Sequence, residues 1–420
     1  MKVKKKKMSC QDVYDLPVEK RKRPIKQSRI LRFLIKILSF TELRKIKFKH
    51  HEYGMEKLGK NEPCLILMNH SCFLDMKIAC HIFKRRFNIV CTEDAFIGKK
   101  ILLKYLGCVS TLKYLSDPTM VRDLVYIVKN LKQSILMYPE ACYSFDGTAT
   151  VLPESLAKCL KLLKIPVVVV QTKGAFARNP LYNNLQLRKV EVSADVTYAL
   201  SPEDIASKSV DELNEIIASY FSFDNFKWQQ DNKVKVSEPF RADSLNRILY
   251  KCPHCLTEGK MVGKGTTIVC EHCKKEYELT EYGYLKALNG DTKFDHIPNW
   301  VKWERECVKQ EILDGKYNLE TEVDIWMLKN SKCFYEVGSG VLKQDSDGFH
   351  LVGCDGAIDF KQPVTASYTL NCDFFFYEVG DVICIGDTVA RYYCFPKNQK
   401  DIVQKARLAQ EEMYKLLPKK

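Results

Sequence analysis

The chain has 420 residues, enough for two or three domains, and 46% of them are hydrophobic, which argues against wholesale disorder. The formal net charge is +14, but residues 1–50 contain 17 Lys and Arg against 4 Asp and Glu, so the remainder is nearly neutral. A uniformly basic nucleic-acid-binding protein would distribute its charge differently, and no nucleic-acid partner is expected.

The eighteen cysteines mostly lie singly inside apolar runs, as Cys64, Cys91 and Cys159 do. No apolar core leads to a cleavage site near the N-terminus, so we expect no signal peptide. No apolar run approaches the roughly 18 residues of a transmembrane helix. These features predict a protein of a reducing cytosol.

Residues 1–45 are predicted to form a basic tail followed by an amphipathic helix over 28–40, with Ser28 as its N-cap. Arg29, Arg32 and Lys36 share one helical stripe, and apolar residues cover the rest. Such a helix suits the interface of an anionic membrane, with its cations toward the headgroups. The alternative is a helix packed on its own domain beside a solvated basic tail.

A strand-like run at 64–68 ends at His70, and Asp75 follows five residues later. A histidine oriented by a carboxylate can take a proton from a hydroxyl at neutral pH. A second strand-like run, 133–138, leads into Glu140, and a third lies at 165–171. With another strand expected at 88–92 and helices at 73–84, 97–106, 118–131 and 153–163, the pattern predicts α/β layers with a mainly parallel sheet.

These motifs, in this order, resemble those of the glycerolipid acyltransferases, in particular the 1-acylglycerol-3-phosphate acyltransferases. Asn69-His70-Ser71 to Asp75 matches the first motif, and Glu140 matches the Glu of the E-G-T-R motif. Ala141, Cys142 and Tyr143 replace the remaining residues of that motif. The resemblance assigns an acyltransferase domain to residues 46–225.

The resemblance implies site residues as well as a fold. His70 and Asp75 would be catalytic, with His70 as general base and Asp75 fixing its tautomer. The substrate-binding residues would be Glu140, Lys113, Lys100, Ser144 and Pro166. Of these, Glu140 would hold the glycerol part of the acceptor and the lysines its phosphate. The Pro166 strand would belong to the core or line an acyl slot. Cys72 and Cys142 are interpreted as small buried residues rather than nucleophiles.

A second kind of motif lies further along, in the pattern C-x-x-C, fourteen residues, C-x-x-C. Cys252, Cys255, Cys270 and Cys273 have nearly the standard spacing of a structural Zn²⁺ site, which predicts a zinc ribbon over 245–285. Substitution of a thiolate by His254 or His272 is the less favoured alternative.

The remaining chain is predicted to contain a helical connector, 286–330, and a β-rich domain, 331–420. Seven short strands are expected, at 333–337, 340–343, 349–352, 366–370, 374–378, 382–385 and 390–395, before a closing helix at 398–417. This order resembles a pleckstrin-homology-like barrel.

The sequence therefore predicts a peripheral enzyme on the cytoplasmic face of the cell membrane. It would transfer an acyl chain from acyl-CoA or an acyl carrier protein to the sn-2 hydroxyl of 1-acylglycerol 3-phosphate (lysophosphatidic acid), forming phosphatidic acid. Two alternatives stay open. One is acyl transfer to a different lysophospholipid or lipid alcohol, and the other is a catalytically inactive zinc-ribbon binding protein.

Overall fold

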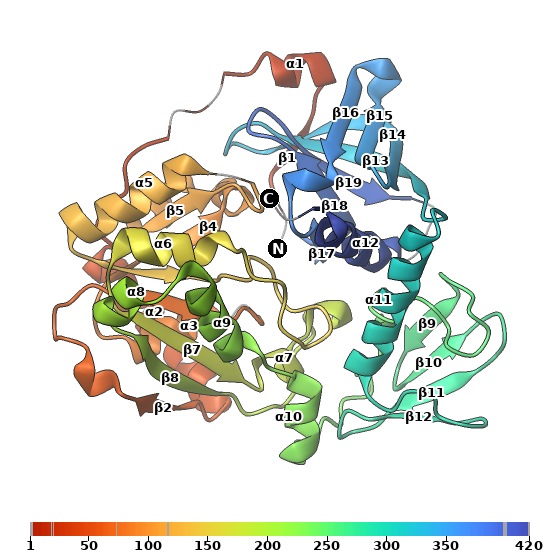
Figure 1. Ribbon diagram of the computed structural model, residues 1–420, viewed down its shortest axis with the longest axis horizontal. Helices are drawn as coiled ribbons and strands as arrows, with labels where there is room; N and C mark the ends of the chain where they lie inside the picture. The colour runs from red at the N-terminus through yellow and green to blue at the C-terminus, as the bar shows by residue number, and fades with distance from the viewer. Residues whose placement is uncertain are drawn as a thin grey trace.

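Three β-sheets and the helices around them build the protein (Figure 1). They form an α/β domain, a small ribbon and a β-rich C-terminal domain. The structure is a computed structural model that describes residues 3–17, 19, 21–72, 74–115, 117–397 and 401–418. Phe73 and residues 398–400, with which two of the predicted helices begin, lie outside the described residues.

A seven-stranded sheet organises the α/β domain, in the order β2-β8-β7-β3-β6-β4-β5. All neighbouring pairs are parallel except β7 and β8, so the sheet is mixed. The strands are β2 (Lys49–Tyr53), β3 (Leu65–Met68), β4 (Phe87–Thr92), β5 (Cys108–Thr111), β6 (Ser134–Met137), β7 (Val167–Lys173) and β8 (Ser193–Leu200).

Helices cover both faces of this sheet, because β3 sends Ile66 and Met68 to one core and Leu65 and Leu67 to the other. A strand buried on both faces is a continuous apolar run, which is how β3 reads in the sequence. The helices of this domain are α2 (Arg29–Lys45), α3 (Asp75–Ile82), α4 (Lys100–Tyr105), α5 (Pro118–Tyr126), α6 (Ser155–Leu163), α7 (Ala175–Arg178), α8 (Pro202–Ser207), α9 (Val210–Phe221) and α10 (Asn225–Asp231).

The ribbon is a four-stranded antiparallel sheet in the order β12-β11-β10-β9. Its hairpin of β9 and β10 separates the two cysteine pairs, and the indole of Trp300 in the next helix donates to the carbonyl of Lys251 at 3.0 Å. The elements are β9 (Met261–Lys264), β10 (Thr267–Cys270), β11 (Glu276–Leu279), β12 (Leu285–Ala287) and helix α11 (Ile297–Leu313).

The C-terminal domain is an antiparallel sheet in the order β16-β15-β14-β13-β19-β18-β17, with α12 packed on it. β13 lies where the sequence predicted the end of a helical connector, and the predicted strands 333–337 and 340–343 are one long strand, β14. The elements are β13 (Leu319–Leu328), β14 (Phe334–Asp345), β15 (Gly348–Gly353), β16 (Ile358–Pro363), β17 (Asn371–Phe376), β18 (Gly380–Gly386), β19 (Arg391–Pro396) and α12 (Ile402–Leu416).

The N-terminal segment is built into this distant domain rather than left as a tail. β1 (Lys5–Lys7) pairs in parallel with β14, with Lys5 opposite Phe334. The next helix, α1 (Cys10–Tyr14), buries Cys10 and Val13 in the same core. The lysine cluster at the start of the chain is therefore an edge strand, with Lys5 paired to Glu336 at 2.5 Å.

The orientation of α2 differs from the predicted one. Arg32, placed by the sequence in a headgroup-facing stripe, is 7% exposed, with its guanidinium bonded to Gln27 and to the carbonyl of Phe83. Several apolar side chains of the helix point outward, including Phe33 at 63% exposed and Leu38 at 75%, while Leu43 is buried and Leu31 and Ile35 pack on the core. No helix of the described residues is long and apolar enough to cross a bilayer.

Candidate functional site

The candidate catalytic residues lie at the carboxyl ends of adjacent parallel strands. His70 follows β3, and Glu140 follows β6, which pairs with β3. The carboxyl ends of parallel strands meet at one edge of a sheet, where open α/β folds place their chemistry. Asp75 reaches the same edge because it is the first residue of α3.

His70 and Asp75 form a hydrogen-bonded pair, with Nδ1 of the imidazole 2.9 Å from Oδ2 of the carboxylate. The same oxygen accepts the backbone N–H groups of Ser71 at 2.8 Å and Cys72 at 3.2 Å. A carboxylate oxygen accepts, so this pair places the N–H on Nδ1 and leaves Nε2 as the proton acceptor. Asp75 is 1% exposed, whereas 24% of the His70 side chain is exposed.

Two tyrosines pack against the imidazole of His70. The Tyr138 ring is stacked at 4.1 Å between centroids, and the Tyr143 ring is tilted at 4.2 Å. Tyr143 occupies the position at which the resembled motif has Arg. Sequence reasoning identified this replacement but gave no sign that the ring would contact His70.

Glu140 supports the backbone around His70. Its Oε2 accepts the N–H of His70 at 3.0 Å, and its Oε1 accepts the N–H of Thr150 at 3.1 Å. Burial raises the pKa of Glu140 to about 7, although these hydrogen bonds act in the opposite direction. Both carboxylate oxygens are thus engaged by the protein's own backbone.

The loop after Glu140 is tied to the same histidine. Ser144 donates its N–H to the carbonyl of His70 at 3.1 Å, while its hydroxyl donates to the carbonyl of Thr148 at 2.6 Å. Ala141, at the motif's Gly position, adopts φ 56°, a left-handed conformation that costs roughly 1–2 kcal/mol for a residue with a side chain. The loop therefore keeps a glycine-like backbone without the glycine.

Lys113 lies after β5, where the α/β domain meets the C-terminal domain. Its ammonium is 5.4 Å from the centre of the Tyr114 ring, and Tyr114 donates to the carbonyl of Glu140 at 3.1 Å. Burial opposes the charged form, but the surrounding negative charges, including Asp373 of β17 and Asp94, raise the pKa of Lys113 overall. Burial also raises the pKa of Asp373 to about 7. Sequence reasoning had no signal for Asp373, because the domains meet only in the folded chain.

Two predicted substrate-binding residues lie away from His70. Lys100 is in α4 and its ammonium is paired with Glu19 on the exposed surface. Pro166 precedes β7, and its carbonyl accepts the N–H of Leu65, the first residue of β3. It is therefore at the opposite end of the strands from His70, and the structure does not bring it into this site.

The buried thiols next to the site show no activation. Burial raises the pKa of Cys72 well above its usual value, and the adjacent Asp75 charge adds to the effect. Burial also raises the pKa of Cys142, which outweighs the lowering by Lys113 and Arg407. A raised pKa disfavours the thiolate, the form that acts as a nucleophile.

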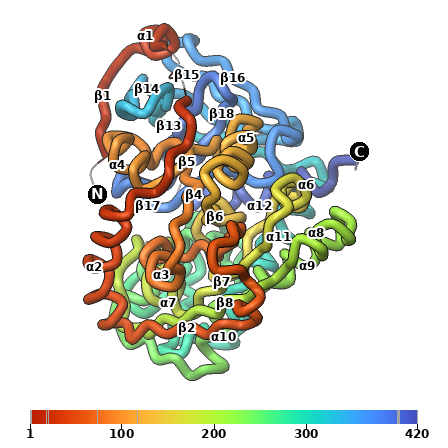
Figure 2. Tube along the Cα trace, turned by 90° about the vertical axis from the view of Figure 1, so that its left-hand side faces the viewer, coloured from red at the N-terminus to blue at the C-terminus, as the bar shows by residue number. Residues whose placement is uncertain are grey.

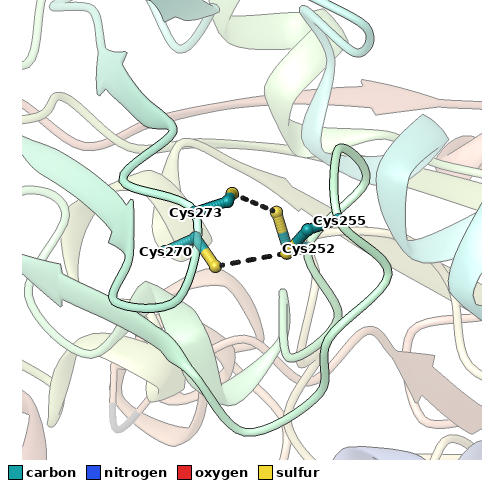
Figure 3. Close-up of side chains that lie close together, drawn as sticks. All are labelled: Cys252, Cys255, Cys270 and Cys273. Atoms are coloured by element: carbon teal, nitrogen blue, oxygen red, sulfur yellow. Dashed lines mark hydrogen bonds between the residues drawn. The ribbon is translucent and has the colours of Figure 1, made fainter.

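A second site lies in the ribbon, where four cysteine sulfurs come together (Figure 3). All four lie within 4.8 Å of one another, and the pairs Cys252–Cys273 and Cys255–Cys270 are 3.7 Å apart. Four sulfurs at about 2.3 Å from a tetrahedral Zn²⁺ would be about 3.8 Å apart. The cluster therefore fits a metal such as zinc.

Comparisons with known proteins give weak structural similarity and no sequence match. No protein-family model and no curated protein matches the sequence. Among solved structures, the 1-acyl-sn-glycerophosphate (LPA) acyltransferase PlsC from Thermotoga maritima is similar with a TM-score of 0.40 and 16% sequence identity. The match covers 50% of this chain and 82% of that one.

Proposed function

We propose that this protein is an O-acyltransferase whose general base is His70. The observation that carries the proposal is the 2.9 Å pair of His70 Nδ1 and the buried Asp75 at the carboxyl edge of a parallel sheet. A buried, hydrogen-bonded carboxylate keeps the imidazole oriented and stabilises the imidazolium that forms when Nε2 takes a proton. The partial exposure of His70 supports access by a substrate.

The reaction needs no covalent acyl-enzyme. As the acceptor hydroxyl attacks the carbonyl carbon of an acyl thioester, its proton passes to Nε2 of His70 and a new C–O bond forms. The tetrahedral intermediate then collapses, the C–S bond breaks, and the thiolate leaves. The imidazolium returns its proton to that thiolate, which restores the neutral base. A thiol with a pKa near 8.5 is a far better leaving group than an alcohol.

The finer proposal is that the donor is acyl-CoA or an acyl carrier protein and the acceptor is 1-acylglycerol 3-phosphate. Lys113 supports a phosphorylated acceptor, since its cation lies beside Tyr114, which is bonded to the Glu140 segment. A different lipid alcohol is the second candidate, which the Tyr143 ring favours because it occupies the position of a phosphate-binding Arg. An acceptor panel separates the two.

The test is acyl transfer from a long-chain acyl-CoA to lysophosphatidate, followed by thiol release. General base catalysis is typically worth 10²–10⁴-fold, so His70→Ala should lose about that factor in kcat. Asp75→Asn should lose a comparable share, because the ring would no longer be held by an anion. His81→Ala is the matched control, since His81 lies at the other end of α3 against Phe48. Unchanged transfer in His70→Ala would remove the proposal.

We also propose that the enzyme works as a peripheral protein on the cytoplasmic face of an anionic membrane. Figure 2 shows α2 and α4 close together on the outer surface, and Ser28 before α2 donates to the carbonyl of Tyr105 at the end of α4 at 2.8 Å. Exposed apolar side chains from both helices support membrane insertion; they are Ile30, Phe33, Leu34, Ile37, Leu38, Phe40, Ile101, Leu102 and Tyr105.

The ribbon is proposed to carry a structural Zn²⁺ held by Cys252, Cys255, Cys270 and Cys273. Four thiolates close the coordination shell and leave no position for a substrate, so such a metal would stabilise the fold and take no part in acyl transfer. The close packing of Trp300 on Tyr277, at 5.1 Å between rings, supports this role because it connects the ribbon to α11.

A further inference from the structure

The C-terminal helix α12 brings a buried arginine to the loop that holds His70. Arg407 is 5% exposed, and its guanidinium carbon lies 4.5 Å from the centre of the Phe145 ring. Phe145 directly follows Ser144, whose N–H is bonded to the carbonyl of His70. A cation from the last helix of the chain is thus separated from the candidate base by one short loop.

The guanidinium of Arg407 keeps one donor that its own domain leaves without a partner. Its Nε is buried and has no hydrogen-bond partner among the described residues. Glu411 forms an ion pair with Arg407, but its Oε1 is 3.8 Å from Nε, which is beyond hydrogen-bonding distance. Glu411 is already engaged by Arg305 at 2.6 Å and by Thr369 at 2.7 Å. A buried N–H donor without a partner is costly, and an acceptor brought to Nε would remove that cost.

A second cation reaches the same place from the other domain. Cys142 lies within electrostatic range of both Lys113 and Arg407, which oppose the effect of burial on its pKa. Glu411 and Asp146 raise the pKa of Arg407 against the effect of burial, so its charge is partly compensated, but its Nε still has no hydrogen-bond partner among the described residues. Asp373 acts on Lys113 rather than Arg407 and has a pKa of about 7, and Asp146 accepts from the backbone and hydroxyl of Thr148.

We propose that Arg407 and Lys113 together bind the phosphate of a phosphorylated glycerol acceptor, so that the C-terminal domain completes the site. This inference rests on the proposed acyltransferase function. The planar guanidinium of Arg407 supplies a pair of donors, which the ammonium of Lys113 lacks. Tyr143, at the Arg position of the motif, cannot supply them either. The acceptor then lies across the boundary between the two domains, with its free hydroxyl toward His70.

Binding is tested without turnover, by the unfolding midpoint of the full-length protein with glycerol 3-phosphate or with glycerol. The phosphate compound should raise the midpoint of the wild type, and glycerol should not, because only a ligand of the folded state stabilises it. Arg407→Met and Lys113→Met should each abolish the rise. Arg407→Lys keeps the charge and the fold but should weaken binding at least several-fold.

Kinetics then distinguish a positioning role from a structural one. Arg407→Lys and Lys113→Met should raise KM for lysophosphatidate about 10–100-fold and change KM for an uncharged monoacylglycerol much less. Arg305→Gln is the matched control, because it disturbs the same Glu411 network at a distance from the Glu140 loop. It should leave both KM values unchanged.

The outcomes are separable. No rise with glycerol 3-phosphate in the wild type, or a full rise in Arg407→Lys and Lys113→Met, overturns the phosphate site. If the unfolding midpoint rises only when both cations are present, but the protein shows no acyl transfer, the phosphate site stands and the proposed acyltransferase function is wrong. If Arg305→Gln raises KM for lysophosphatidate as much as Arg407→Lys does, Arg407 acts only as part of a structural ion-pair network and the proposal is wrong.

Discussion

At the scale of single residues, the candidate base is fixed by its surroundings from several directions. Asp75 holds its ring, Glu140 accepts its N–H, and Ser144 donates to its carbonyl. Ring rotation and backbone movement are thereby both restrained. An imidazole held this way keeps Nε2 directed at one place, which is the condition for efficient proton transfer.

Because the pKa of Glu140 is raised, the folded protein should become less stable as the pH rises. Burial raises this pKa from the ordinary 4.5 to about 7, so the folded state binds more protons than the unfolded state between these values. The contribution is full below about pH 4.5 and is lost as the pH rises through 7. Glu140→Gln removes this dependence, and the wild type should lose on the order of 3 kcal/mol relative to the variant across that window.

Urea unfolding of both proteins from pH 4.5 to 7.5 measures this difference. Other groups, including Asp373, titrate in both proteins and cancel in the comparison. A difference in unfolding free energy that stays constant over the range would show that the pKa of Glu140 is the same in the folded and unfolded states.

The residues of the site could be predicted only in part. His70, Asp75 and Glu140 follow strand-like apolar runs, so their arrival at one sheet edge follows from parallel pairing. The packing of Tyr138 and Tyr143 on His70, and the approach of Asp373 and Arg407, depend on contacts across loops and domains. Local sequence carries no signal for such contacts. Pro166 was misplaced because a buried strand has two ends, and only one of them holds the site.

At the scale of elements, α2 and α4 form a surface whose role can be tested. Full burial of an apolar side chain contributes roughly 1.5–3 kcal/mol, so Phe33→Glu with Leu38→Glu should weaken binding to anionic vesicles more than tenfold. Both side chains are mainly exposed, so the unfolding midpoint should stay the same. Leu313→Glu, at a site 58% exposed on α11, is the control.

Vesicle co-sedimentation gives the readout. If the double variant and the wild type bind vesicles equally, another surface of the protein contacts the membrane. Weakened binding by Leu313→Glu to the same degree would indicate a general effect of added negative charge.

Metal removal should act on the ribbon and on what packs against it. We expect about one Zn²⁺ per chain in the purified protein, and its loss in Cys270→Ser, because that substitution removes one of the four thiolate ligands. Metal binding to such sites contributes directly to folding, so the unfolding midpoint should fall strongly in the variant or with a chelator. Cys307→Ser, a cysteine of α11 outside the cluster, should keep both metal and midpoint.

Elemental analysis and thermal unfolding decide the outcome. A metal-free wild type, or a Cys270→Ser variant with a full complement of zinc, would contradict a four-thiolate site.

The elements that the sequence missed are those without a strong apolar pattern. β2 is almost wholly exposed and has the sequence Lys-His-His-Glu-Tyr, so nothing in it indicates a strand. β13 alternates buried and exposed residues, but it follows a long helix and was taken into the same connector. In α2, Arg29 is exposed as the predicted stripe requires and Lys36 is half-buried, but Arg32 is buried against the domain. A stripe alone does not say which side faces the protein.

At the scale of the whole molecule, one buried cluster unites the ribbon, the C-terminal sheet and part of the α/β domain. It contains Phe145 beside Phe374 of β17, with ring centroids 4.4 Å apart. An ion pair of Arg391 with Glu93 at 2.6 Å lies on the same boundary. The three parts are therefore expected to unfold together rather than one by one.

Phe374→Ala tests this coupling. Removal of a buried Phe typically costs about 3–5 kcal/mol, and here the vacated space adjoins the loop that holds His70. We expect lower stability and a lower kcat/KM. Phe349→Ala, equally buried but inside the β-rich domain, should cost similar stability with little effect on turnover of the folded protein. Equal activity of both variants would argue against coupling.

The pairing of β1 with β14 has a consequence for how the chain is made and cut. After β1 is synthesised, more than 300 further residues follow before its partner exists, since Lys5 lies opposite Phe334. Until then its three lysines keep an unpaired edge soluble. In the finished protein, a protease that cleaves once after Arg23 would release nothing. The short N-terminal fragment would stay hydrogen-bonded to the far end of the chain and separate only under denaturing conditions.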